Sequence, residues 1–272
     1  PTRPVGRDQD HSLYFRTHGD AIGLGSYNHE TLSVDPEAMG KNDADGQASV
    51  RGFTEEHWTT PTHRYRDTSA KQAFDELLPA TADAEYAATE NGIFVFTPDG
   101  MPAVGPTEVD GLWSGLAIWW THSGGYGRIL AEWMENGVPR LPSGPVDTGG
   151  IHVRRFEPHA GERDYFVDRG ATRYEQVYMN VEPRWQPDDH RGLRTSPFYA
   201  QQEALGAEFY QSGGWETPQW YESNADLVER YADRIPEQDG WQGINRSPIE
   251  GAEHLHTREA VSMFDMTTFT SI

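Results

Sequence analysis

Residues 91–136 read NGIFVFTPDGMPAVGPTEVDGLWSGLAIWWTHSGGYGRILAEWMEN, in which two apolar runs precede a glycine-rich turn and a helical pattern. The runs at 92–97 and 112–120 are short and rich in aromatic and β-branched residues, which predicts two buried strands. A Pro-Asp-Gly turn at 98–100 separates them, because proline fixes its φ angle, aspartate bonds its own backbone and glycine accepts a positive φ. Apolar residues then recur at helical spacing up to Gly137, which predicts a helix that ends in a glycine C-cap.

The glycine-rich turn at 121–127 stands between a predicted strand and a predicted helix. This order directs backbone N–H groups at an anion or at a developing negative charge. A tight turn that binds no ligand gives the same pattern, so the pattern alone leaves both interpretations open. His122 lies in this turn, either as a ligand contact or as a histidine that satisfies nearby backbone groups.

The same residues resemble a known family of flavoproteins. NGIFVFTPDGMPAVGP (91–106) is similar to the family's segment with the FTPDG turn, and LAIWWTHSGGYGRILAEWM (116–134) is similar to its last strand and following helix. The resemblance continues in order through FEPH (156–159) and through residues 196–225 and 247–267. The chain is therefore identified as a member of the D-amino-acid-oxidase-like superfamily, and it most resembles the dimethylglycine oxidase, dimethylglycine dehydrogenase and sarcosine dehydrogenase group.

This resemblance implies a set of residues around the flavin. In the family, a tyrosine that matches Tyr14 lies beside the flavin, where a phenol can donate a hydrogen bond or assist proton transfer; the alternative is a half-buried strand tyrosine. Tyr27 is a weaker candidate for the pocket wall. Four residues would line the isoalloxazine ring: Ile118, Trp119, Trp120 and Thr121. The amides of Ser123 and Gly124 would lie near its N1–C2=O edge, and His122 would contact flavin or substrate. The family shows a single tryptophan here, so the pair leaves open which ring faces the flavin.

The resemblance also implies cofactors and a reaction. In the intact family enzyme, FAD takes a hydride equivalent from the N-methyl carbon of dimethylglycine or sarcosine, and the iminium passes to tetrahydrofolate or hydrolyses to formaldehyde. The family holds the FAD pyrophosphate with an N-terminal GxGxxG motif. This chain has no such motif, because no glycine follows Gly23-Leu24-Gly25 at the third position. We therefore expect these residues alone to bind FAD weakly or not at all and not to turn over.

The expected fold class is α+β, with a mixed or antiparallel sheet followed by a small β-rich domain. The expected domains are the C-terminal part of the FAD-dependent oxidoreductase domain (1–140), a central domain (151–208) and the start of an aminomethyltransferase-like folate domain (209–272), with a Pro- and Gly-rich linker at 140–150. Three functions remain open. The chain is a section of an oxidoreductase, or a non-catalytic product or subunit that needs a separate chain with the FAD nucleotide-binding fold, or an aminomethyltransferase-type folate-binding module.

Composition limits the classes of partner. The 272 residues carry a net charge of −21, and Lys41 and Lys71 are the only lysines. Abundant acid with little lysine predicts a halophilic source, where salt screens self-repulsion; an ordinary acidic cytosolic protein from a GC-rich genome is the alternative. No basic run is present to follow nucleic-acid phosphates, and no apolar stretch reaches the ~20 residues of a membrane span. We expect a cytoplasmic protein that binds a small-molecule substrate, without nucleic acid, membrane or metal.

Local signals predict the remaining elements. They are a hairpin at 12–27, an exposed loop at 35–52, a helix near 54–58, a helix capped by Thr68 or Ser69, a strand at 153–156, a helix at 250–264 and a strand at 265–267. The run RGLR at 191–194 predicts an interdomain contact rather than a site. Four aromatic residues near the C-terminal end are expected to pack rather than to bind: Trp215, Trp220, Tyr221 and Trp241.

Overall fold

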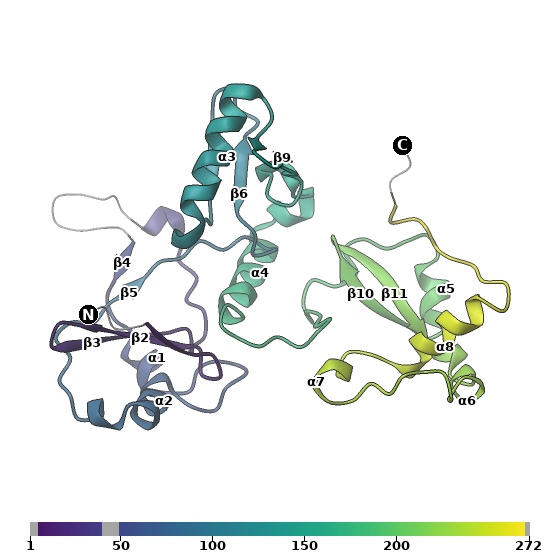
Figure 1. The fold of residues 1–272 in the computed structure, drawn as a ribbon, viewed down its shortest axis with the longest axis horizontal. Helices are drawn as coiled ribbons and strands as arrows, with labels where there is room; N and C mark the ends of the chain where they lie inside the picture. Colours follow the sequence, from purple (N-terminus) through teal and green to yellow (C-terminus); the bar gives the residue numbers. More distant parts are fainter. Residues whose placement is uncertain (1–4, 40–48, 270–272) are drawn as a thin grey trace. The chain divides into compact units, whose positions relative to one another are not determined.

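The computed structural model describes residues 5–39 and 49–269, and it divides the chain into two compact units, Pro1–Asn180 and Val181–Ile272. Each unit combines short helices with small antiparallel sheets, which confirms the α+β class in its coarse form (Figure 1). Within the described ranges, every helix is too short or too polar to span a lipid bilayer.

The first unit begins with a three-stranded antiparallel sheet, β1 (Gly6–Asp8), β2 (Leu13–His18) and β3 (Ala21–Ser26). The hairpin at 12–27 is thereby confirmed. Aromatic rings pack over two glycines of the neighbouring strands, because Gly6 pairs with Phe15 and Gly25 pairs with Tyr14. A side chain at either glycine would collide with its partner's ring, since a Cβ atom would lie 2.2 Å from Phe15 and 2.0 Å from Tyr14.

Two helices, α1 (Glu55–Thr59) and α2 (Ala70–Leu77), follow as predicted. Ser69 caps α2, because its Oγ atom accepts a hydrogen bond from the Gln72 amide at 3.2 Å. Three α2 residues and Leu13 of β2 form a buried apolar core: Ala70, Ala73, Phe74 and Leu13. In the predicted loop at 35–52, a 3-10 turn (Pro36–Ala38) and β4 (Val50–Arg51) are observed, and residues 40–48 lie outside the described ranges.

The first apolar run, at 92–97, was predicted as a strand, and this is wrong beyond its first residue. Only β5 (Asn91–Gly92) pairs, with the two-residue strand β4. The Ile93 amide still donates to the Ser49 carbonyl at 2.9 Å, and then the chain leaves its partner. Phe94 and Val95 are half exposed, and among the described residues no further strand pairs with this segment.

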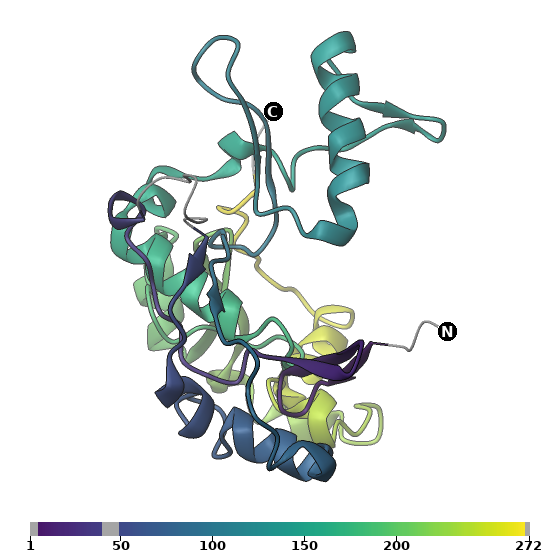
Figure 2. The same cartoon turned by 90° about the vertical axis from the view of Figure 1, so that its left-hand side faces the viewer.

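The second apolar run forms a shorter strand than predicted. β6 (Ala103–Pro106) pairs with β7 (Trp113–Leu116), and the strand ends there because its partner has only four residues and Ala117 adopts a positive φ of 55°. A 3-10 turn (Trp120–His122) then leads into α3 (Ser123–Asn136), which ends at Gly137 with φ of 72°, as predicted. Figure 2 shows α3 beside the β6–β7 hairpin, where Trp133 of α3 packs against Gly105.

The remainder of the first unit contains a small hairpin, β8 (Arg140–Leu141) with β9 (Gly144–Pro145), two 3-10 turns (Val153–Arg155 and Pro158–Gly161) and α4 (Arg163–Glu175). The predicted strand at 153–156 is therefore wrong. The His152 Nδ1 atom accepts from the Arg154 amide and starts the 3-10 turn, and Arg155 reaches back to Asp99 with two hydrogen bonds of 2.7 Å.

The second unit is built on the antiparallel pair β10 (Ala207–Ser212) and β11 (Trp215–Tyr221). Its helices are α5 (Tyr199–Ala204), α6 (Leu227–Arg230), α7 (Gly240–Gly243) and α8 (Pro248–Thr257), with a 3-10 turn at Glu222–Asn224. Tyr210, Trp220 and Ile249 form its buried cluster, so Trp220 packs as expected, whereas Trp241 is half exposed.

The helix predicted at 250–264 has different ends in the structure. It begins earlier, at Pro248, because Ser247 caps it, and it ends at Thr257. Val261 and Phe264 beyond its end are exposed rather than buried. The strand predicted at 265–267 is not formed, because the Asp265 carboxylate accepts hydrogen bonds from the Thr267 amide and from Gln202.

Candidate functional site

Seven aromatic residues of the first unit form one connected group, which we call the aromatic cluster: Tyr14, Tyr27, Phe94, Phe96, Trp119, Tyr174 and Tyr178. Tyr27 lies at its centre, with ring centroids 5.9 Å from Tyr14, 5.9 Å from Phe94 and 4.7 Å from Tyr178. Phe94 in turn lies 5.7 Å from Trp119. The structure therefore joins Tyr14 of the first hairpin to Trp119 of the central stretch through two intervening rings.

Tyr14 is positioned by the hairpin that carries it. Its ring extends across the neighbouring strand over Gly25, where the missing side chain leaves room for it. The side chain is 39% exposed on its other side. Burial, with Tyr178 as a second cause, raises the pKa of Tyr14, so the phenol stays protonated at neutral pH and can donate a hydrogen bond.

Tyr174 of α4 supports the buried side of the cluster. Its ring lies 5.4 Å from Tyr27 and 5.7 Å from Phe96. Its hydroxyl lies 2.7 Å from the His29 Nε2 atom, and the His29 Nδ1 atom lies 2.7 Å from the Glu30 carbonyl. Because a carbonyl only accepts, Nδ1 carries the proton and the neutral ring accepts from Tyr174 through Nε2. Burial raises the pKa of Tyr174 and lowers the pKa of His29, which favours this neutral pair.

Two further histidines lie beside this pair. His57 stacks on His29 with centroids 4.9 Å apart. His63 accepts at Nδ1 from the Tyr65 amide and donates at Nε2 to the Glu175 carbonyl, so it too is neutral, and burial lowers its pKa. These histidines have backbone and ring partners that account for their positions, so they support the cluster rather than add a second site.

Residues 118–124, which were predicted to line a flavin, differ in burial. Ile118 and Trp119 are partly buried, and Trp119 joins the aromatic cluster. Trp120 is 91% exposed and points away from the unit's core. Thr121, His122, Ser123 and Gly124 are exposed as well. The two neighbouring tryptophans thus have different environments, and only Trp119 shares a cluster with Tyr14.

The start of α3 has features that suit a negatively charged group. No side chain caps this end of the helix, since His122 at the N-cap accepts nothing from the helix amides. A Cβ atom at Gly124, Gly125 or Gly127 would meet nothing within 4 Å, so a planar ligand can approach the backbone there. The Ser123 amide donates to the Trp120 carbonyl, which makes the Gly124 amide the better candidate of the two predicted contacts.

These features fit the ring of a flavin. The Trp119 side chain offers an apolar aromatic surface, and the uncapped helix start offers N–H groups that suit a negative charge such as a reduced flavin carries. Two open hollows of the second unit share Gln238 and Arg246 and are lined by none of the residues predicted to contact flavin or substrate, so we assign them no part in this site.

Sequence reasoning missed several members of the aromatic cluster. Phe94 and Phe96 were part of a predicted buried strand, and Tyr174, Tyr178 and His29 were not singled out at all. No local spacing marks them, because they meet only when the chain from β2 to α4 has folded. Among the predicted residues, Tyr14, Tyr27 and Trp119 are brought together, and the others are not.

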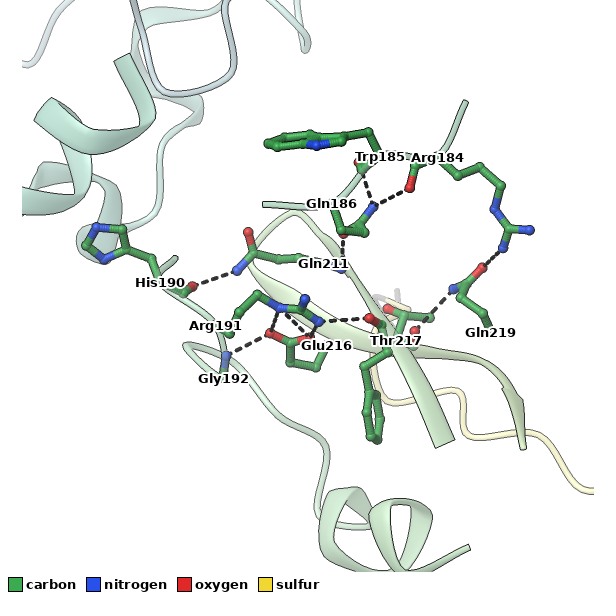
Figure 3. Close-up of polar contacts among 11 residues, drawn as sticks. Arg184, Trp185, Gln186, His190, Arg191, Gly192, Gln211, Glu216, Thr217 and Gln219 are labelled. Carbon is green, nitrogen blue, oxygen red and sulfur yellow. Dashed lines mark hydrogen bonds and ion pairs between the residues drawn. The ribbon is translucent and has the colours of Figure 1, made fainter. Parts of the chain in front are cut away.

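The second unit contains a separate polar group around the buried carboxylate of Glu216, which is only 2% exposed (Figure 3). Arg191 donates to it from Nε at 2.9 Å and from Nη2 at 2.6 Å, and the Gly192 amide donates at 2.7 Å. Arg191 also donates to the Phe209 carbonyl, and Arg194 stacks over Trp215 at 4.4 Å. This arrangement ties the segment before β10 to the hairpin, and both oxygens of the Glu216 carboxylate accept hydrogen bonds.

Two protein-family models match adjoining parts of the chain, and the boundary between them lies just after Arg194. Residues 143–196 match the FAD dependent oxidoreductase central domain, and residues 198–272 match the GCVT N-terminal domain. Arg191 and Glu216 lie in different family matches, 143–196 and 198–272, and both belong to one compact unit of the structure.

Several curated proteins that resemble the chain are much longer oxidoreductases. A 4-methylaminobutanoate oxidase (formaldehyde-forming) from Paenarthrobacter nicotinovorans is 29% identical over 99% of this chain and 30% of its own length. The human mitochondrial sarcosine dehydrogenase is 26% identical over 98% of this chain and 29% of its own length. The mouse pyruvate dehydrogenase phosphatase regulatory subunit is 29% identical over 71% of this chain and 21% of its own length. The chain spans about 30% of the first two relatives.

Proposed function

We propose that the chain forms part of the site where a methylated amine is oxidised by FAD, because almost its whole length is similar to sarcosine dehydrogenase and to 4-methylaminobutanoate oxidase. The observation that carries this proposal is the meeting of Tyr14 and Trp119 in one aromatic cluster beside the uncapped start of α3. In this proposal the flavin, when bound, accepts a hydride equivalent from the N-methyl carbon of the substrate.

The residues of the chain position the reactants and hold protons. Tyr14, which is protonated at neutral pH, donates a hydrogen bond to the substrate and orients its amine. Trp119 and Ile118 would offer the apolar surface against which the ring system packs and from which water is excluded. The Gly124 amide at the start of α3 would stabilise the negative charge that a reduced flavin carries.

We further propose the substrate class and the domain roles. Dimethylglycine and sarcosine are the proposed substrates, and the one-carbon unit would pass to tetrahydrofolate in the intact protein. Residues 1–140 would supply the flavin-facing part, residues 151–208 the central domain and residues 209–272 the start of the folate domain. The match of residues 198–272 to the GCVT N-terminal domain supports the folate part of this proposal.

A second candidate function is non-catalytic. The mouse pyruvate dehydrogenase phosphatase regulatory subunit is similar to 71% of this chain, and its name is that of a regulatory subunit rather than of an enzyme. In this candidate, the chain either acts as a subunit that a separate FAD-binding chain completes, or serves as an aminomethyltransferase-type folate-binding module.

Flavin binding to the purified chain tests the proposal, with absorbance at 350–500 nm and flavin fluorescence as readouts. If the chain supplies a wall for the ring and no fold for the pyrophosphate, riboflavin and FAD should bind weakly and with equal affinity, because the adenylate half finds no partner. Trp119→Leu should weaken both ligands about equally and by more than Trp120→Leu, since only Trp119 lies in the cluster.

Two results would overturn the proposal. Absence of binding of either flavin at millimolar concentration would show that these residues do not form a flavin surface. A much tighter binding of FAD than of riboflavin, unaffected by Trp119→Leu, would place the flavin elsewhere in the chain.

A further inference from the structure

Tyr174 and His29 form a hydrogen-bonded pair of a phenol and a base within the first unit. The Tyr174 hydroxyl lies 2.7 Å from the His29 Nε2 atom, and the proton on His29 Nδ1 is donated to the Glu30 carbonyl. The Nε2 lone pair is therefore the acceptor of the phenolic hydrogen bond. A phenol that loses one electron becomes a far stronger acid, so its proton would move along this bond to His29 as the electron leaves.

The surroundings of His29 suit the arrival of a proton at the moment of oxidation. Burial lowers the pKa of His29, and His57 and His63 act in the same direction, so the ring is neutral beforehand and its Nε2 atom is free to accept. His57 stacks on His29, and the Glu30 carboxylate lies 3.7 Å from the Nε2 atom of His57. A negative charge thus lies close to the imidazolium that forms.

Contacting phenol rings connect Tyr174 with the surface of the unit. Its ring centroid lies 5.4 Å from Tyr27, and Tyr27 lies 5.9 Å from Tyr14, within the range of about 4.5–7 Å for aromatic pairs in contact. Tyr14 is 39% exposed, so an external oxidant can reach it. Tyr178 also contacts Tyr27, but the Arg7 guanidinium lies 3.6 Å above its ring, and a cation there opposes the loss of an electron.

We propose that Tyr174 is a redox-active tyrosine, which gives one electron through Tyr27 and Tyr14 to a one-electron oxidant outside the chain and gives its phenolic proton to His29. The O–H bond of Tyr174 breaks, an N–H bond forms at His29 Nε2, and the oxidant is reduced by one electron. The products are a neutral tyrosyl radical and an imidazolium, and return of the electron and the proton restores the pair. This reaction needs no bound flavin, so its test is independent of the proposed function.

Photochemical oxidation of the whole chain tests the proposal. Light and persulfate generate a ruthenium(III) tris-bipyridine complex as the oxidant, and electron paramagnetic resonance distinguishes tyrosyl from tryptophanyl radicals. Radicals on exposed rings decay quickly because two molecules can couple, whereas the Tyr174 radical should persist because its ring is partly buried. Tyr174→Phe should remove most of the long-lived tyrosyl signal. An unchanged long-lived signal in this variant would overturn the proposal.

His29→Gln tests the role of the base. Glutamine can accept the hydrogen bond but does not take the proton, so the long-lived signal should fall by more than about tenfold, the factor that a single pKa unit represents. A signal as strong as that of the wild type would show that the proton goes elsewhere and would overturn the proposal.

The wild-type radical offers a test without any substitution. After proton transfer, the new N–H group of His29 donates to the oxygen of the Tyr174 radical. Electron–nuclear double resonance should therefore detect one strongly coupled proton that exchanges with deuterated water. Absence of such a proton from the long-lived radical would contradict the proposed pair.

Two tyrosines of the second unit provide matched controls. Tyr210 is buried, and its hydroxyl donates to the Asn245 carbonyl, which takes no proton; Tyr210→Phe should leave the long-lived signal unchanged. Tyr231 is also buried, and it donates to the Glu259 carboxylate at 2.9 Å, so it is the rival source of a radical. Loss of the signal in either control variant, with retention in Tyr174→Phe, would assign the radical to the second unit and overturn the proposal.

Discussion

At the scale of single residues, Gly25 determines where the Tyr14 ring can lie. A Cβ atom at this position would lie 2.0 Å from the Tyr14 Cζ atom and 2.3 Å from its hydroxyl oxygen. Gly25→Ala should therefore push the ring aside and weaken riboflavin binding, because Tyr14 belongs to the aromatic cluster of the proposed flavin site. The free energy of unfolding should change by less than about 1 kcal/mol, because only the end of one side chain has to move. Isothermal titration and denaturant unfolding measure the two quantities.

Gly52→Ala is the matched control for this change. Nothing lies within 4 Å of a Cβ atom at Gly52, so neither affinity nor stability should respond. Unchanged affinity in Gly25→Ala, with the same Tyr14 environment as the wild type, would show that the ring does not depend on this glycine.

His29 should make the first unit sensitive to mild acid. Burial lowers the pKa of His29 in the folded state, so the unfolded chain binds the proton more readily. Stability is therefore complete above the ordinary histidine pKa and falls as pH decreases through and below about 6.5. His63, whose pKa burial also lowers, contributes in the same direction. Chemical denaturation between pH 7.5 and 5 measures this decrease.

His29→Gln identifies the contribution of His29 to the acid response. Glutamine does not titrate and can still accept a hydrogen bond from Tyr174. The unfolding free energy of the variant should therefore fall less steeply than that of the wild type between pH 7.5 and 5. An identical slope in wild type and variant would assign the acid response to other groups.

At the scale of elements, the local sequence predicts the helix α3 well, and the first turn of this helix is open to ligands. Gly124→Ala and Gly127→Ala should each stabilise the helix, by up to about 1 kcal/mol, because glycine is a poor helix former. Only Gly124 lies at the proposed flavin contact, so only the methyl group added by Gly124→Ala should obstruct riboflavin. Thermal unfolding and riboflavin titration of both variants check this. Equal riboflavin affinity in the two variants would remove Gly124 from the site.

The success of sequence prediction also differs between elements. Ser69 and Gly137 mark helix ends through their own side chain or backbone, and these signals suffice locally. The apolar runs at 92–97 and 112–120 contain the composition of strands, but strand length depends on the partner, and their partners β4 and β6 have only two and four residues. The predicted helix at 250–264 is too long at its C-terminal end, because the apolar residues beyond Thr257 are exposed and gain nothing from helix packing.

The candidate site depends on contacts between residues far apart in the sequence, and local patterns do not predict such contacts. Tyr14 and Trp119 were available from the sequence because both lie in segments that resemble the family. Tyr174 and Tyr178 lie far along the chain, in and just after α4, and nothing in their neighbourhood indicates that they will contact Tyr27. Only the folded first unit reveals that a central ring connects them.

At the scale of the whole molecule, the net charge of −21 should make stability depend on salt. Like charges repel more strongly in the compact state, and salt screens them, since the Debye length falls from about 10 Å at 0.1 M to about 3 Å at 1 M. The melting temperature should therefore rise with KCl. Screening changes little above 1 M, so most of the rise should occur below that concentration.

Sucrose is the control that separates charge screening from general exclusion of solutes. It favours the compact state through exclusion from the protein surface and does not screen charge. If screening stabilises the chain, KCl at 1 M should raise the melting temperature by much more than sucrose at the same concentration. Full stability at low salt, with equal small effects of both solutes, would exclude adaptation to high salt and would favour an ordinary acidic protein whose charges are spaced widely enough to tolerate one another.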